Sequence, residues 1–243
     1  MFQVGNEFAK EVISHINHIS FSDEEDFCYK GAMLFFFCKA YKTYQAIQIL
    51  WDKGFQEDAF ILARTIFEIA LQAQYMRDDP RTRARLFTEH DPVMRYRYYK
   101  KMNKHGLLNE MSDNRKKELD ELEKHYNKLK DNYPEHKGWW GKSIAWLAED
   151  QGDHMKKRYD LIYWIQSNLV HSATTSFKDY LKEQGEGFKI NCNPSISNDE
   201  MIPQEATLFF MRICELVCHA LAIDKKVSVN KWYENYKEIF INK

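Results

Sequence analysis

The chain has few residues that can end a helix, and this scarcity restricts its fold more than any other feature. It contains only 9 glycines and 5 prolines in 243 residues, far fewer than the many tight turns of an all-β protein require. Between these residues lie long runs rich in Leu, Ala, Lys, Glu and Gln, which all favour helices. The sequence therefore predicts an all-α protein.

Apolar residues recur every three or four positions in these runs, which is the spacing of one buried helix face. Pro92 is expected to break one helix in two near Asp91. Residues 184–203 lack a helical pattern, although 188–192 could form a short extended piece. With its breakers, the pattern predicts helices over 2–19, 24–52, 56–78, 81–103, 113–131, 143–150, 154–171, 199–223 and 228–241.

The chain is expected to form one domain over residues 1–243. Its 44% hydrophobic content can supply a core, and it has no internal repeat or long linker. We expect a helical bundle in which 24–52 and 56–78 form a central hairpin, 154–171 packs against that hairpin, and the C-terminal helices over 199–241 pack on the bundle.

Composition also predicts where the protein works. The longest apolar run, residues 31–38, is too short to span a bilayer, and the N-terminus is charged, so we expect a soluble, cytoplasmic protein with no membrane partner. Five cysteines without a CxxC pair favour free thiols, four of them in apolar helices and expected in the core. A formal net charge of −1 leaves nucleic-acid binding to depend on local patches.

The most informative predicted helix covers residues 58–76. It is apolar nearly all round, which is typical of a helix at the centre of a bundle. Arg64, Glu68 and Gln72 nevertheless lie on one line at i, i+4 and i+8. Burial of that line is costly unless its members pair. Arg64 and Glu68 are therefore either a structural ion pair between helices or part of a functional site.

The stretch "QSNLVHS" (166–172) places polar residues at the end of another apolar helix. Tyr163, Ser167 and His171 line up at i, i+4 and i+8, which puts three hydrogen-bonding side chains in a row. A helix C-terminus favours the protonated imidazole, a useful property for an acid or base. The alternative role of His171 is to cap the helix.

A basic segment follows the second central helix. Residues 77–104 hold nine Arg or Lys against four acidic residues, and 95–101 alternate cations with tyrosines. Such a surface suits a phosphate backbone with bases stacked on Tyr. An ordinary amphipathic helix with solvated cations is the alternative. The candidate nucleic-acid-binding residues are Arg95, Arg97, Tyr98, Lys100 and Lys101.

Three motifs taken together resemble a known family. They are "ARTIFE" (63–68), "GWWGKSIAWLAED" (138–150) and "YDLIYWIQSNLVHS" (159–172). The set resembles an uncharacterised family of bacterial helical proteins, a domain of unknown function with an R-T-x-x-E helix, a W-x-x-S-I segment and an S-x-x-V-H-S helix end. The resemblance covers about residues 30–180.

That family in turn looks distantly similar to the HEPN helical bundles. The similarity implies an HEPN-like bundle, a homodimer with a shared cleft, and a metal-independent ribonuclease or nucleotide-targeting protein of toxin or phage-defence type. HEPN nucleases use an Arg four to six residues before a His, but here Gln166 stands five before His171. Arg64 on the neighbouring helix is then expected to supply the guanidinium, with Glu68 holding Arg64 or orienting His171.

The predicted catalytic set is thus Arg64, Glu68, Ser167 and His171, acting on RNA or a nucleotide. We expect no cofactor, because the chain has no Gly-rich phosphate loop, nucleophile elbow or HExxH helix. We expect no metal, because His15 with His18, and Cys214 with Cys218 and His219, lack a second pair at zinc-site spacing. The alternative function is a non-catalytic helical module that binds a protein partner or senses a ligand.

Overall fold

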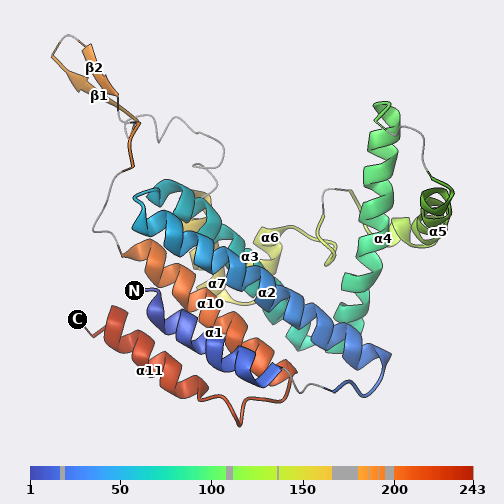
Figure 1. The fold of residues 1–243 in the computed structure, drawn as a ribbon, viewed down its shortest axis with the longest axis horizontal. Coiled ribbons are helices and arrows are strands. Elements are labelled where there is room, and N and C mark those ends of the chain that lie inside the picture. The colour runs from blue at the N-terminus through green and yellow to red at the C-terminus, as the bar shows by residue number, and fades with distance from the viewer. Residues whose placement is uncertain are drawn as a thin grey trace.

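The fold is all-α, with one small β-hairpin, as a computed structural model shows (Figure 1). The structure describes residues 1–16, 20–107, 112–135, 137–165, 180–185, 187–190, 192–194 and 200–242. In this part of the chain, no helix has the length and apolar character needed to cross a membrane.

Three long helices form the centre of the bundle. They are α2 (Glu24–Asp52), α3 (Gln56–Asp78) and α10 (Met201–Ala220), and each packs against the other two. The predicted central hairpin of α2 and α3 is confirmed at the predicted boundaries. Gly54, at φ 82°, adopts the left-handed conformation that lets the chain reverse between them. Cys38 on α2 is exposed, so its predicted place in the core is wrong. The apolar spacing of a helix does not show which of its sides the neighbouring helices cover.

The first and last helices cover one side of this centre. Helix α1 (Gln3–Ile16) packs against α10, and α11 (Val229–Phe240) packs against both. Phe8 on α1 stacks on Trp232 of α11 at a ring separation of 5.8 Å. Glu11 accepts a hydrogen bond from the Trp232 indole at 2.5 Å. The N- and C-terminal segments therefore belong to the same core as the central helices.

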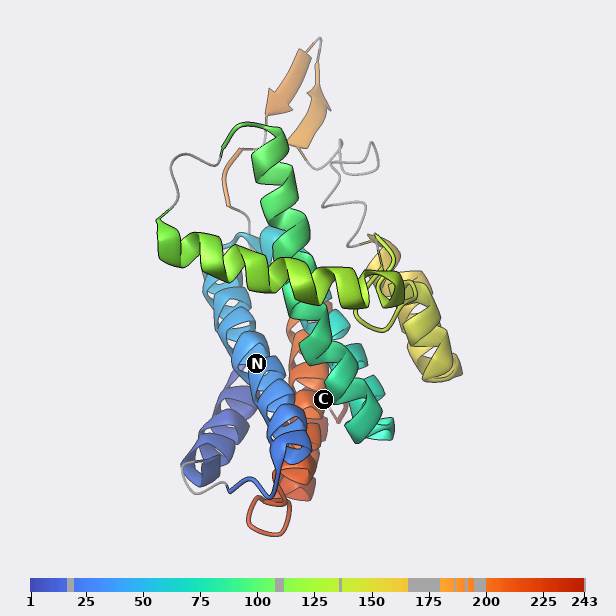
Figure 2. The same ribbon diagram turned by 90° about the vertical axis from the view of Figure 1, so that its right-hand side faces the viewer.

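Helix α4 (Pro80–Lys104) and α5 (Asp113–Leu129), which ends in the 3₁₀ turn η1 (Lys130–Asn132), form an arm. The start of α4 packs on α2, and its far half leaves the bundle (Figure 1). Helix α5 crosses α4 steeply (Figure 2). The arm has its own small core of Val93, Leu129 and Tyr133, separate from the main one.

The expected break at Pro92 is wrong, because α4 continues through it. Proline removes one backbone hydrogen bond and strains the preceding turn. Packing on both sides compensates: Phe87 contacts Phe36 of α2 at 5.2 Å between ring centres, and Val93 is fully buried in the arm core. Tyr133 also donates its hydroxyl to the Leu86 carbonyl at 3.1 Å.

The remaining elements are short. Helix α6 (Ile144–Asp150) packs on α3, and α7 (Asp153–Arg158) continues into the π-helical turn η2 (Tyr159–Tyr163). The strands β1 (Leu181–Gln184) and β2 (Gly187–Ile190) form an antiparallel hairpin that pairs Leu181 with Ile190. The first residues of the predicted extended piece, 188–190, thus lie in β2.

Tyr44 ties the three parts of the core together. It is fully buried, its ring stacks on Phe210 at 4.5 Å, and its hydroxyl lies 2.8 Å from the Thr207 hydroxyl and 3.1 Å from the Phe2 carbonyl. A buried polar group that loses its partner costs about 1–3 kcal/mol. Thr207 is buried, so loss of the Tyr44 hydroxyl would remove a buried partner of its hydroxyl, whereas the Phe2 carbonyl also accepts from the Asn6 backbone N–H at 3.2 Å.

We therefore expect Tyr44→Phe to lower the free energy of unfolding by about 1–3 kcal/mol, measured by urea denaturation. The matched control is Tyr41→Phe, since Tyr41 stacks in the same aromatic group and its hydroxyl has no hydrogen-bond partner among the described residues. The control should change stability by less than about 0.5 kcal/mol. Equal effects of the two variants would show that the hydrogen bonds of the Tyr44 hydroxyl do not stabilise the core.

Candidate functional site

The polar line predicted on α3 lies at the edge of the core, where it is only partly covered. The Arg64 and Glu68 side chains keep 24% and 31% of their surface exposed. Arg64 donates through Nε to Glu68 Oε1 at 2.9 Å. The pair is therefore neither sealed in a dry core nor free in solvent.

A tyrosine from another segment completes the contact with Arg64. Tyr163 is buried, and its hydroxyl oxygen accepts a hydrogen bond from Arg64 Nη2 at 2.5 Å. The Arg64 guanidinium carbon also lies 4.3 Å from the centre of the Tyr163 ring, within cation–π range. Glu68 and Tyr163 together hold the guanidinium in one orientation.

The backbone of Tyr163 belongs to the π-helical turn η2. Such turns are rare and frequently occur at functional sites. Here the wide turn stacks Tyr159 on Tyr163 with ring centres 4.5 Å apart. Tyr163 also faces Phe67 of α3 at 6.2 Å. The local helix geometry thus gives Tyr163 a fixed position above α3.

An ion pair anchors this segment to α10. Arg158, just before the π-helical turn, contacts Glu205, and these side chains are only 21% and 12% exposed. The Arg158 guanidinium carbon lies 5.4 Å from the centre of the Phe209 ring. Phe209 in turn contacts Phe67 edge-on at 4.9 Å. One chain of contacts therefore connects α10, η2 and α3 below Arg64.

The third residue of the polar line binds a different segment. Gln72 Oε1 accepts a hydrogen bond from the Trp139 indole at 2.9 Å. The segment around Trp139 is compact, since a Cβ on Gly138 would lie 2.3 Å from the Trp140 ring. Ser143 then caps α6 by accepting from the Trp146 backbone N–H at 3.2 Å. The W-x-x-S-I segment thus has a structural role beside the polar line.

The surroundings of Arg64 and Tyr163 favour the protonated form of both side chains. Burial acts to lower the pKa of Arg64, but the hydrogen bond and charge of Glu68 outweigh it and raise the pKa. Burial, followed by the charge of Glu68, raises the pKa of Tyr163 well above its usual range. The site therefore presents a permanent cation beside a protonated phenol.

The rest of the predicted catalytic set cannot be placed with Arg64 and Glu68. Ser167 and His171, with Gln166, lie outside the residues that the structure describes. The described residues before them end at Ile165. The structure thus brings two of the four predicted residues together and adds Tyr163, which the sequence placed in line with Ser167 and His171.

Most of the predicted nucleic-acid-binding residues contact other parts of the arm. Arg95 pairs with Glu118 of α5, Arg97 donates to the Tyr133 carbonyl, and Lys100 lies 5.1 Å from the Tyr126 ring centre. Tyr98 and Lys101 are exposed, and Tyr98 keeps 64% of its surface accessible. Arg95 and Lys100 therefore help to hold α5 on α4, and Arg97 holds the segment that follows α5.

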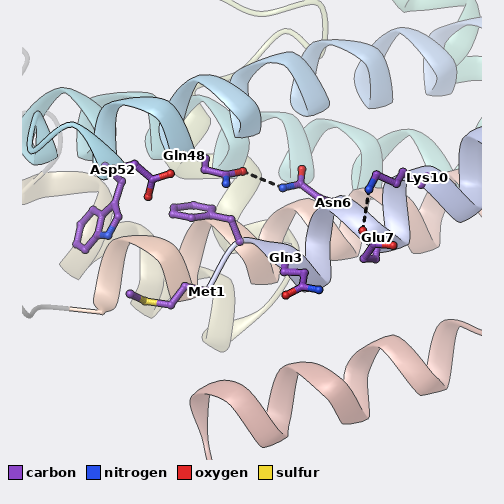
Figure 3. Close-up of a pocket in the computed structure, with 9 residues that line it drawn as sticks. Met1, Gln3, Asn6, Glu7, Lys10, Gln48 and Asp52 are labelled. Carbon is purple, nitrogen blue, oxygen red and sulfur yellow. Dashed lines mark hydrogen bonds and ion pairs between the residues drawn. The ribbon is translucent and has the colours of Figure 1, made fainter.

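A separate cavity of about 340 Å³ lies between α1 and the end of α2 (Figure 3). Four of its polar side chains form two pairs: Asn6 donates to Gln48 at 2.8 Å, and Lys10 donates to Glu7 at 2.7 Å (Figure 3). No residue predicted as a site residue lines it. The cavity is therefore not part of the Arg64 site.

No group of three metal-binding side chains occurs within the ranges that the structure describes. Cys214 and Cys218 are buried in α10, whereas His219 is exposed. His15 lies on α1, and its predicted companion His18 is outside the described residues.

A family model matches residues 30–188, which include α3, the arm, α6 and the π-helical turn. This is more than half of the chain. The chain belongs to DUF5677, a family of unknown function. The three motifs predicted membership of a helical family of unknown function over about residues 30–180, and the family match confirms this prediction.

The match to DUF5677 leaves out α1, α10 and α11, although α10 packs against both α2 and α3 in the core. The matched segment therefore depends on helices outside it for its packing. Neither the curated proteins nor the solved structures compared with the chain match it.

Two partners of the site were not predicted from sequence. In the sequence, Tyr159 is an ordinary apolar residue of a helix, and Trp139 is an ordinary residue of a loop. In the structure, Tyr159 stacks on Tyr163 and Trp139 donates a hydrogen bond to Gln72. A signal was present for Trp139, because Gln72 needs a hydrogen-bonding partner wherever the helix line is covered. The π-helical turn has no such signal in the sequence.

The Arg158–Glu205 pair should contribute more to stability than an exposed pair. We expect Arg158→Met to lower the free energy of unfolding by about 1–3 kcal/mol, because Glu205 is left poorly solvated. The control is Arg95→Met. Its partner Glu118 is 49% exposed, so this substitution should lower the free energy of unfolding by less than about 1 kcal/mol. Urea unfolding measures both. An effect of Arg95→Met as large as that of Arg158→Met would contradict the anchoring role.

Proposed function

We propose that the chain acts on RNA, with Arg64 binding a phosphate of the strand and His171 moving a proton in metal-independent cleavage. The proposal combines the geometry around Arg64 with the sequence of the helix that carries Tyr163. Ser167 and His171 follow Tyr163 in the sequence at i+4 and i+8, so a helix continued through them would present them on the same side.

The observation that carries the proposal is the set of unused donors on Arg64. A guanidinium has five N–H donors, and Arg64 uses one for Glu68 and one for Tyr163. The other three have no acceptor among the described residues. A partly exposed, fixed guanidinium with free donors suits a phosphate, which it can bind through two parallel hydrogen bonds.

The chemistry would divide between two groups. Neutral His171 would accept the proton of a ribose 2′-hydroxyl while the 2′-oxygen attacks the adjacent phosphorus. The bond from phosphorus to the 5′-oxygen would break, and the imidazolium would return the proton to that oxygen. Arg64 would stabilise the negative charge that develops on the phosphate oxygens. The products would be a 2′,3′-cyclic phosphate and a 5′-hydroxyl.

The arm would contribute contacts away from the reacting phosphate. Tyr98 and Lys101 remain exposed on α4, so a base could stack on Tyr98 with a phosphate at Lys101. The HEPN-like affinity, a homodimer, a cytoplasmic location and a toxin or phage-defence role belong to the same proposal.

A second candidate is a non-catalytic helical module that binds a protein partner. It is favoured by the internal use of Arg95 and Arg97, which would otherwise bind a backbone. In that case Arg64, Glu68 and Tyr163 would serve only to fasten η2 to α3.

The experiment is RNA cleavage by the purified protein with a chelator present. A 5′-labelled single strand should give fragments ending in a 2′,3′-cyclic phosphate, and a fully 2′-O-methylated strand should bind without cleavage. His171→Gln should reduce the rate by about 10²–10⁴ with binding retained. Arg64→Gln should weaken binding and reduce the rate.

The matched control is Arg77→Gln, an exposed arginine on the same helix that pairs with Asp78; it should leave both measurements unchanged. Cleavage that survives His171→Gln would overturn the catalytic assignment. RNA binding unaffected by Arg64→Gln, or no binding by the wild type, would favour the partner-binding module.

A further inference from the structure

The cavity between α1 and the end of α2 is separate from the Arg64 site and has no part in the proposed function. Its volume of about 340 Å³ lies within the usual range of small-molecule sites. Two nearly buried rings, Phe2 and Trp51, line it together with polar and charged side chains. The cavity thus has the apolar walls and the few polar groups of a ligand site.

Two helix ends of opposite polarity meet at this cavity. Helix α1 begins at Gln3 and α2 ends at Asp52, and both residues line it (Figure 3). The start of a helix carries a partial positive charge, and its end carries a partial negative charge. The cavity therefore favours a ligand that has both an anionic and a cationic group.

Neither helix end is neutralised by the chain itself. Helix α1 has no acidic residue in its first turn, and the backbone N–H groups of Gln3, Val4 and Gly5 have no acceptor among the described residues. Helix α2 has no basic residue in its last turn. The Asp52 carboxylate there forms no ion pair or hydrogen bond within the described ranges. Lys53, the next residue, does not line the cavity.

Trp51 provides an independent sign of a ligand. This cavity-lining residue keeps only 8% of its surface exposed. Its indole N–H has no hydrogen-bond acceptor in the part of the chain that the structure describes. A buried indole N–H usually has such a partner. The cavity thus combines an unused donor with the unpaired carboxylate of Asp52, which is the next residue.

We propose that this cavity binds a free α-amino acid with an apolar side chain. The ammonium group donates to Asp52 at the negative end of α2. The carboxylate accepts from the first N–H groups of α1 and from the Trp51 indole, as anions do at helix starts. The apolar side chain lies against the rings of Trp51 and Phe2. A ligand with one charge would leave one of the two helix ends without a partner.

The experiment titrates the full chain by calorimetry with L-phenylalanine, L-leucine and two analogues of phenylalanine. One analogue, 2-phenylethylamine, lacks the carboxylate, and the other, 3-phenylpropionate, lacks the ammonium group. Both amino acids should bind with a Kd below about 1 mM, and each analogue should bind about tenfold more weakly than phenylalanine. Asp52→Asn should weaken phenylalanine binding about tenfold and leave 3-phenylpropionate unchanged. The matched control is Asp131→Asn, an exposed aspartate of the arm, which should change neither.

A second variant, Gln3→Glu, separates ligand binding from stability. A carboxylate in the first turn of α1 stabilises the helix, so the unfolding temperature should not fall. The same carboxylate repels that of the ligand, so phenylalanine should bind about tenfold more weakly, whereas 2-phenylethylamine should not. Failure of both amino acids to bind, an analogue that binds as tightly as phenylalanine, or phenylalanine binding that Asp52→Asn and Gln3→Glu leave unchanged would overturn the proposal.

Discussion

The structure around the candidate site depends on one constraint: α3 carries a line of polar side chains although it lies in the core. Its apolar side chains pack on α2 and α10, so the polar line can be covered only by groups that hydrogen-bond. Trp139 donates a hydrogen bond to Gln72, and Tyr163 and Glu68 each accept one hydrogen bond from Arg64. The segments that carry Trp139 and Tyr163 are held against α3 for this reason, and the π-helical turn gives Tyr163 its position.

The core that supports this line does not come from one continuous part of the chain. DUF5677 covers residues 30–188, but α10 lies outside that match and contributes Phe209 and Glu205 beneath the site. Tyr44 likewise joins α2 to α10 and to the N-terminal segment. A change in the outer helices should therefore reach Arg64 through packing.

Much of the fold follows from the sequence, because the runs of α2 and α3 are long, apolar and bounded by clear breakers. Pairing of Arg64 with Glu68 also follows, since helical spacing places them side by side. The continuity of α4 through Pro92 and the exposure of Cys38 do not follow. Both depend on which distant segments cover a helix, and helical periodicity carries no information about that. The internal use of Arg95 and Arg97 depends in the same way on how α5 crosses α4.

The most direct test of the central claim is the state of the Arg64 guanidinium when RNA binds. Side-chain ¹⁵N spectra of the wild type would be compared with and without a 2′-O-methylated single strand, with the Arg64 signals assigned from Arg64→Lys. We expect the Nη signals of Arg64 to shift and become protected from exchange, while its Nε–H stays bonded to Glu68. Arg64 signals that do not change at saturating RNA, with changes confined to arginines of the arm, would contradict a phosphate-binding role for Arg64.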